Sequence, residues 1–263
     1  MEIRLSIALV TRNRPASLRR CLTSLRAQSI QPSEIVISDD SDDPADTFAG
    51  AKEFGARYIE GPRRGLYANR NAAALACSGS HIRTMDDDHT FPPGHLAQCL
   101  AAVTRDPASV WTCGERSFID GQPYDFTPRA AQLHPSGVSG PIADPDDNWA
   151  IADGATILPR AVFDRGYRYF EEYRFGSSYL EFGALLYARG WRSRCLDGAF
   201  IEHHADRATL DRDEPRSRLF ACLCYNLHFR PSLWRALRYG ARSAAYAREI
   251  PALLRKIERR WQT

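Results

Sequence analysis

Short apolar runs alternate with amphipathic stretches along the first hundred residues. Residues 5–10 form an apolar run of strand length. Apolar residues then recur at helical spacing over 18–25, behind Pro15, which suits the first turn of a helix because its missing N–H costs nothing there. Residues 34–38 form a second apolar run. This order of strand, helix and strand predicts an α/β sheet with parallel neighbours.

The alternation continues to residue 113 and then stops. Further strands are expected over 57–60, 81–85 and 109–113, and further helices over 66–77 and 94–104. Residues 114–149 are rich in Pro, Gly, Asp and Ser and lack sustained periodicity, which is typical of a functional loop or a disordered segment. Beyond them we expect strands over 151–158 and near 199–202, a helix over 178–189, and two helices after residue 214 that separate near Pro231.

We therefore predict a single α/β domain over residues 1–210, with a mostly parallel central sheet flanked by helices. A C-terminal helical extension is expected over 211–263. A length of 263 residues suffices for one such domain with a full core.

Composition narrows the class of protein. A formal charge of +3 is too small to argue for nucleic-acid binding. Seven cysteines without a paired spacing indicate reduced, mostly buried thiols. No apolar run approaches the ~20 residues of a spanning helix, and the N-terminus does not resemble a signal peptide. We expect a cytoplasmic protein.

Acidic side chains follow the expected strands. Asp39-Asp40 closes the second strand, and Asp86-Asp87-Asp88 closes the strand over 81–85. Ligands of an open parallel sheet bind beyond such strand ends. Three adjacent carboxylates repel one another, and a hard cation such as Mg²⁺ or Mn²⁺ relieves that repulsion. The alternative is a solvated acidic turn or a helix N-cap.

At these residues the sequence resembles the family-2 glycosyltransferases of GT-A fold. The resemblance rests on the runs SIALVTRNRPASLRRCLTSLRAQS, EIVISDDS and GLYANRNAAALACSGSHIRTMDDD. It is strong over residues 1–95, weaker to about 205 and faint beyond. It implies inverting transfer of a sugar from a nucleoside diphosphate sugar to a hydroxyl acceptor, namely a glycan, a lipid-linked saccharide or a small-molecule glycoside. Residues 1–113 would form the nucleotide-sugar-binding half and 114–210 the acceptor half.

The resemblance also assigns roles to single residues. Asp39 is expected to accept a hydrogen bond from the nucleobase, and Arg70 to face the donor nucleotide or its diphosphate. Asp86 is expected at the ribose or donor sugar, and Asp88 on the Mn²⁺ or Mg²⁺ of the diphosphate. The other expected donor-binding residues are Thr11, Arg12, Arg14 and Asp87, and the other expected metal ligands are Asp86, His203 and His204. The alternatives are an Asx turn at Asp39, a surface charge at Arg70 and exposed turn histidines.

The catalytic base is less well defined, because the family's acidic pair is missing. The stretch 152–160 (ADGATILPR) and Phe170-Glu171-Glu172 fit the family pattern, and so does the helix end before Trp191. Where an E-D pair is expected, the chain has only Glu181. A carboxylate must take the proton of the acceptor hydroxyl. Glu181 is the first candidate, followed by Asp153 and Glu172, and a helix-terminal Glu is the alternative for Glu181.

Two rival functions stay open at this point: a sugar-nucleotide-binding module without catalysis, and a nucleotidyltransferase. The latter usually has a Gly-rich phosphate loop with a Lys near the first strand, which this chain lacks. The C-terminal segment mixes Arg with aromatic and aliphatic residues. Helices packed on the sheet with a solvated Arg face explain that mixture most simply, and peripheral contact with the inner face of a membrane is the alternative.

Overall fold

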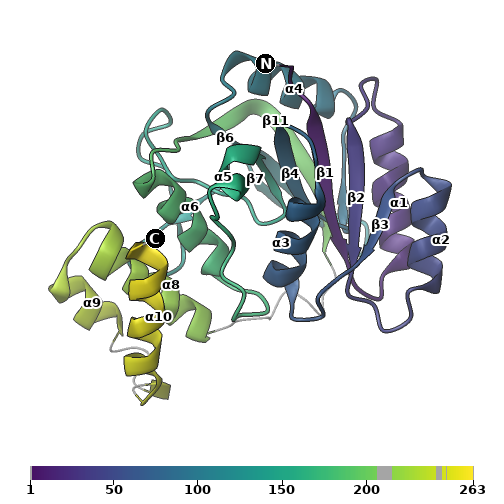
Figure 1. The fold of residues 1–263 in the computed structure, drawn as a ribbon. Helices are drawn as coiled ribbons and strands as arrows, with labels where there is room; N and C mark the ends of the chain where they lie inside the picture. Colours follow the sequence, from purple (N-terminus) through teal and green to yellow (C-terminus); the bar gives the residue numbers. More distant parts are fainter. Residues whose placement is uncertain (1, 206–214, 241–244, 247, 263) are drawn as a thin grey trace.

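The computed structural model describes residues 2–205, 215–240, 245–246 and 248–262 (Figure 1). One curled sheet runs through the molecule, with helices on both faces. Its strands are β1 (Leu5–Thr11), β2 (Glu34–Asp39), β3 (Arg57–Glu60), β4 (His81–Asp86), β5 (His89–Thr90), β6 (Val110–Ile119), β7 (Gln122–Thr127), β10 (Ala155–Pro159) and β11 (Ser193–Ala205). A separate small sheet joins β8 (Gln132–Leu133) to β9 (Ser139–Gly140).

The large sheet is mixed. Its order is β3-β2-β1-β4-β10-β6-β11-β5, with β7 paired to β6. The first four strands in this order are parallel, as the strand–helix–strand pattern predicts. Beyond β4 the pairing is mixed: β11 is parallel to β6, whereas β10 is antiparallel to both β4 and β6, and β5 and β7 are also antiparallel to their partners.

Helices cover both faces of the sheet, and each face has its own hydrophobic core. The helices are α1 (Pro15–Arg26), α2 (Ala45–Glu53), α3 (Leu66–Ala76), α4 (His95–Arg105), α5 (Arg160–Asp164), α6 (Ser178–Ala188), α8 (Pro215–Cys224), η1 (Tyr225–Phe229, a π-helix), α9 (Leu233–Gly240) and α10 (Ile250–Gln262). Leu18, Leu22 and Leu25 of α1 pack with α4 on one face. Helices α3, α5 and α6 cover the other face.

The C-terminal helices share this second core. Phe220 of α8 and Ile257 of α10 are fully buried in the same cluster as Phe182 of α6. The predicted domain boundary at residue 210 lies outside the described residues. None of the helices in the described part of the chain is long and apolar enough to cross a membrane.

The largest departure from the sequence-based expectation is in residues 114–149. We expected this segment to be irregular, but its first part completes β6 and turns back as β7 in a hairpin. All six residues of β7 are exposed, Tyr124 and Phe126 included, so the strand has no buried apolar face that the sequence could mark. The tail after residue 214 contains more helices than the two expected, although the chain does break at Pro231.

Candidate active site

Three neighbouring strands end side by side and bring the acidic residues together. In the parallel register Thr11 lies opposite Asp39, and Val10 lies opposite Asp86. The carboxyl ends of β1, β2 and β4 therefore form one edge, as the sequence predicts. Asp39 is buried there. It accepts a hydrogen bond from the Ser41 amide at 2.8 Å and another from the Tyr58 hydroxyl at 3.3 Å.

The loop after β1 reaches over to the acidic cluster. The Thr11 hydroxyl donates to Asp87 Oδ2 at 2.6 Å. The Arg14 guanidinium contacts Asp87 Oδ1 at 2.7 Å and Asp88 Oδ2 at 2.9 Å. Arg12 differs from both, because its side chain is 58% exposed and its nearest carboxylate is 3.8 Å away, on Asp42. Thr11 and Arg14 thus hold the acidic turn, whereas Arg12 points into solvent at the rim of the site.

Arg70 lies buried between two carboxylates of the site, Asp86 and Asp153. Its side chain is fully buried, and Nη2 donates to both Asp86 carboxylate oxygens at 2.7 and 2.6 Å. Nη1 donates to Asp153. The guanidinium also lies by the ring of Tyr67, 5.6 Å from its centroid. The resemblance placed Arg70 toward the donor nucleotide or its diphosphate, and the structure adds that its guanidinium contacts Asp86 and Asp153.

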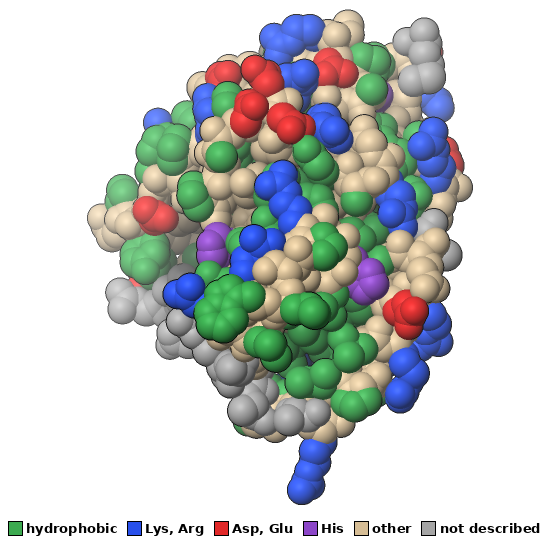
Figure 2. All heavy atoms as spheres, turned by 90° about the vertical axis from the view of Figure 1, so that its left-hand side faces the viewer, with side chains coloured by type: hydrophobic (Ala, Val, Ile, Leu, Met, Phe, Trp, Pro, Cys, Tyr) green, Lys and Arg blue, Asp and Glu red, His purple; other side chains and the backbone are tan. Residues whose placement is uncertain are grey.

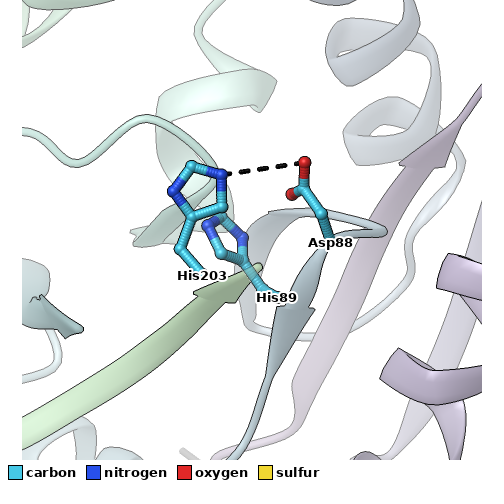
Figure 3. Close-up of side chains that lie close together, drawn as sticks. All are labelled: Asp88, His89 and His203. Carbon is cyan, nitrogen blue, oxygen red and sulfur yellow. Dashed lines mark ion pairs between the residues drawn. The ribbon is translucent and has the colours of Figure 1, made fainter. Parts of the chain in front are cut away.

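Asp88, His89 and His203 point toward one another beside the strand ends (Figure 3). One ligand atom from each lies within 4.8 Å of the other two. Asp88 Oδ1 and His89 Nδ1 are buried and have no hydrogen-bond partner among the described residues. Buried polar atoms are normally paired, so two unpaired ones within this group of side chains fit a cation site. A carboxylate and two imidazoles form a donor set suited to a divalent ion.

Glu115 holds one of these histidines from behind. Its Oε1 lies 2.8 Å from His203 Nδ1, which leaves Nε2 directed at Asp88. Carboxylates in this position fix the orientation of metal-binding histidines. Burial disfavours a charge on His203, but the carboxylates of Asp88 and Glu115 outweigh it and raise the His203 pKa to about 10. A proton on His203 thus balances the negative charge of Asp88 and Glu115. A cation that binds to His203 must displace this proton.

His204 is turned away from this group. Its Nε2 lies 2.9 Å from the Thr90 hydroxyl, and its ring stacks on Phe118 at 5.3 Å. Successive side chains of a strand point to opposite faces, so β11 can direct only one of the two histidines to the acidic turn. His204 was expected among the metal ligands, and the structure puts His89 in the group instead. Asp86, also expected there, is engaged by Arg70.

A glycine brings Asp153 against the acidic cluster. A Cβ atom at Gly154 would lie 2.7 Å from Asp86 Oδ2 and 2.9 Å from His89 Cε1, and its φ of +72° also favours glycine. The absence of a side chain at Gly154 lets the backbone pass close to Asp86 and His89. The side chain of the neighbouring Asp153 is 36% exposed. Burial raises the Asp153 pKa above its ordinary value, although Arg70 opposes the shift.

The other two carboxylates proposed as bases have partners in the C-terminal helix. Glu181 is fully buried, and Arg260 of α10 contacts both of its oxygens at 2.7–3.0 Å. Glu172 pairs with Lys256. We expected Glu181 to be the first candidate, but its carboxylate is enclosed by an ion pair. Of the three, Asp153 shares the site with Asp86.

The sequence matches a known family over most of this fold. The family model described as Glycosyl transferase family 2 matches residues 6–166, which is more than half of the chain. The uncharacterized glycosyltransferase YwdF of Bacillus subtilis (strain 168) is 33% identical over 104 residues. That match covers 38% of this chain and 38% of YwdF.

Solved structures share the fold at low sequence identity. GalNAc-T7, crystallised with UDP, GalNAc and Mn²⁺, superimposes with a TM-score of 0.68 at 15% identity, covering 86% of this chain and 48% of that one. TarS residues 1–349 from S. aureus, in complex with UDP-GlcNAc, superimposes with a TM-score of 0.65 at 14% identity. The match covers 91% of this chain and 71% of the TarS chain. The chain thus spans about half the length of GalNAc-T7.

Proposed function

The chain belongs to glycosyl transferase family 2, and from that premise we propose that it performs metal-dependent, inverting transfer of a sugar from a UDP-sugar to a hydroxyl acceptor. Family membership makes it a glycosyltransferase and not a nucleotidyltransferase. The choice of uridine is supported by the UDP and UDP-GlcNAc bound to the structural neighbours. The acceptor class is a glycan, a lipid-linked saccharide or a small-molecule glycoside.

The nucleotide half of the site lies at the ends of β1 and β2. Asp39 is held by Ser41 and Tyr58, an arrangement that suits a fixed hydrogen-bond acceptor for the uracil. Arg12, exposed at the rim, is free to fold over the bound nucleotide. Asp86 is held by Arg70 with its carboxylate facing the site, where it can accept a hydrogen bond from the ribose or donor sugar.

Asp88, His89 and His203 would hold the cation. A bound Mn²⁺ or Mg²⁺ supplies charge neutralisation for the departing diphosphate. Because Mg²⁺ takes oxygen ligands in proteins, a donor set with two imidazoles favours Mn²⁺ of the two. Glu115 keeps the His203 Nε2 lone pair directed into the site.

Asp153 takes the role of catalytic base in this mechanism. Its carboxylate accepts the proton of the acceptor hydroxyl while that oxygen attacks the anomeric carbon and the bond to the diphosphate breaks. A carboxylate that is partly exposed and raised in pKa accepts a proton more readily than an ordinary Asp. Arg70 holds it beside Asp86, on the donor-sugar side of the site.

The observation that carries the proposal is the grouping of Asp88, His89 and His203, in which Asp88 and His89 each have a buried polar atom without a hydrogen-bond partner among the described residues. Calorimetric titration of UDP, with and without Mn²⁺, tests it. Asp88→Ala and His203→Ala should each weaken Mn²⁺-dependent UDP binding by at least ~10-fold, because loss of a ligand should cost no less than loss of a residue that orients one. His204→Ala is the matched control and should bind like the wild type.

Two results would count against this function. If Asp88→Ala and His203→Ala bind UDP with Mn²⁺ as tightly as the wild type, the cation is not held here. If the wild type binds UDP and Mn²⁺ but releases no UDP from any UDP-sugar, to water or to an acceptor, the protein is a binding module without catalysis.

A further inference from the structure

Helix α9 carries an apolar face that nothing in the described chain covers. Leu233, Trp234 and Leu237 are 74%, 72% and 70% exposed, and none of the helix's eight residues is buried. Leu237 follows Leu233 by four residues and Trp234 by three, so it lies next to both of them on the helix surface. Three large apolar side chains are thus presented together to solvent, which marks an interaction surface.

The surroundings of this face are basic. Residues 215–262 contain eleven Arg and Lys but only two acidic residues, Glu249 and Glu258. Arg230, Arg238 and Arg255 are exposed. Figure 2 looks onto this side of the molecule: hydrophobic and basic side chains gather over its lower half, and most of its acidic side chains lie near the top.

We propose that α9 docks the protein onto an anionic lipid bilayer, with Leu233, Trp234 and Leu237 in the boundary between headgroups and acyl chains. A Trp beside leucines is the side-chain set that lies at this depth, and arginines at its border pair with anionic headgroups. A second copy of the chain fits less well, because two such faces would bring their arginines together.

Trp234 makes this proposal directly measurable. The other four tryptophans, Trp111, Trp149, Trp191 and Trp261, are at most 8% exposed. Changes in tryptophan emission on binding therefore report chiefly on α9. The full chain is mixed with phosphatidylcholine vesicles with and without phosphatidylglycerol. With the anionic lipid we expect co-sedimentation, a blue shift of emission and protection from acrylamide quenching.

Variants identify the surface. Leu233→Ser combined with Leu237→Ser keeps the fluorophore and should weaken partitioning at least about tenfold, because two apolar side chains no longer enter the boundary. Arg238→Glu should weaken it about tenfold. Phe48→Ser, at a 54% exposed position of α2, is the matched control and should leave partitioning unchanged.

Three results would overturn the proposal: vesicle binding that is absent, binding that does not depend on phosphatidylglycerol, or full binding by the double Leu variant. Loss of Trp234 exposure with rising protein concentration, without vesicles, would assign the face to self-association instead. Circular dichroism of the variants, measured in parallel, shows that they are folded. The outcome does not depend on the reaction proposed above.

Discussion

The buried cation Arg70 illustrates how one side chain can hold two carboxylates of the candidate site in place. Its guanidinium joins Asp86, at the end of β4, to Asp153, in the loop before β10. A buried Arg restrains both carboxylates, and Nη2, which donates to both oxygens of Asp86, holds that side chain in one orientation. The carboxylate of Asp153 that remains partly exposed is therefore presented in a set direction.

The choice of base can be decided at single residues. Asp153→Asn keeps the size of the side chain but cannot accept a proton, so release of UDP from a UDP-sugar should fall by ~10²-fold or more while UDP affinity is preserved. Glu172→Gln, an exposed carboxylate paired with Lys256, is the matched control.

In the wild type, UDP release should decline as the pH falls through the Asp153 pKa, which lies above the ordinary Asp value because of burial. This follows because only the deprotonated carboxylate acts as a base. Near-normal turnover by Asp153→Asn would return the role to Glu181, despite its contact with Arg260.

At the residue scale, the sequence predicted the acidic strand ends but not all of their partners. Asp39 and Asp86 could be placed because each follows an apolar run. Glu115 could not, because its contact with His203 depends on the pairing of β6 with β11, which no local pattern encodes. His89 did leave a signal, since an imidazole directly after three aspartates is a metal-ligand pattern in its own right.

At the scale of elements, an ion pair joins α10 to α6. Glu181 is fully buried, and the Arg260 side chain is 13% exposed. Arg260→Ala should lower the free energy of unfolding by ~3–5 kcal/mol, because it leaves Glu181 charged and unpaired in the core. Urea unfolding measures this loss. Arg259→Ala, at the exposed neighbouring position, should change stability by less than ~0.5 kcal/mol.

A second variant checks the explanation. Glu181→Leu combined with Arg260→Leu should recover most of the stability lost in Arg260→Ala, because no buried charge is left without a partner. If Arg260→Ala is as stable as the wild type, α10 is held by its apolar contacts alone.

Elements with a strong local pattern were predictable, and those made by long-range pairing were not. The strands β1 and β2 each contain an apolar run, so their burial on both faces is visible in the sequence. The exposed strand β7 has no apolar periodicity to detect. The antiparallel setting of β10 between β4 and β6 arises from the route of the chain, and its five buried residues fit either direction.

At the scale of the whole molecule, buried histidines make stability depend on pH. Burial and nearby Arg83 lower the pKa of His95 to about 2. The folded state therefore keeps this ring neutral, whereas the unfolded state binds a proton below pH ~6.5. Stability from His95 is complete above that pH and is lost as the pH falls. Acidification from pH 7.5 to 5.5 should cost ~1.4 kcal/mol at this residue.

A comparison of variants isolates this effect, because His203 acts in the opposite direction. Its raised pKa gives stability that is complete below pH ~6.5 and is lost as the pH rises toward 10. His95→Leu should therefore lose ~1.4 kcal/mol less than the wild type between pH 7.5 and 5.5. Urea unfolding at the two pH values measures the loss of stability. An equal loss in the wild type and in His95→Leu would show that the pKa of His95 is not lowered by folding.

The place of β10 in the sheet also sets an order of events during synthesis. The parallel strands β1 to β4 all lie within the first 86 residues, so this part of the sheet can form early on the ribosome. β6 is made before β10, yet it joins β4 only through β10. The edge of β6 that pairs with β10 therefore stays unpaired until residues 155–159 have been synthesised. His203 follows later still, so a nascent chain completes the ends of β1, β2 and β4 well before His203 can join Asp88 and His89.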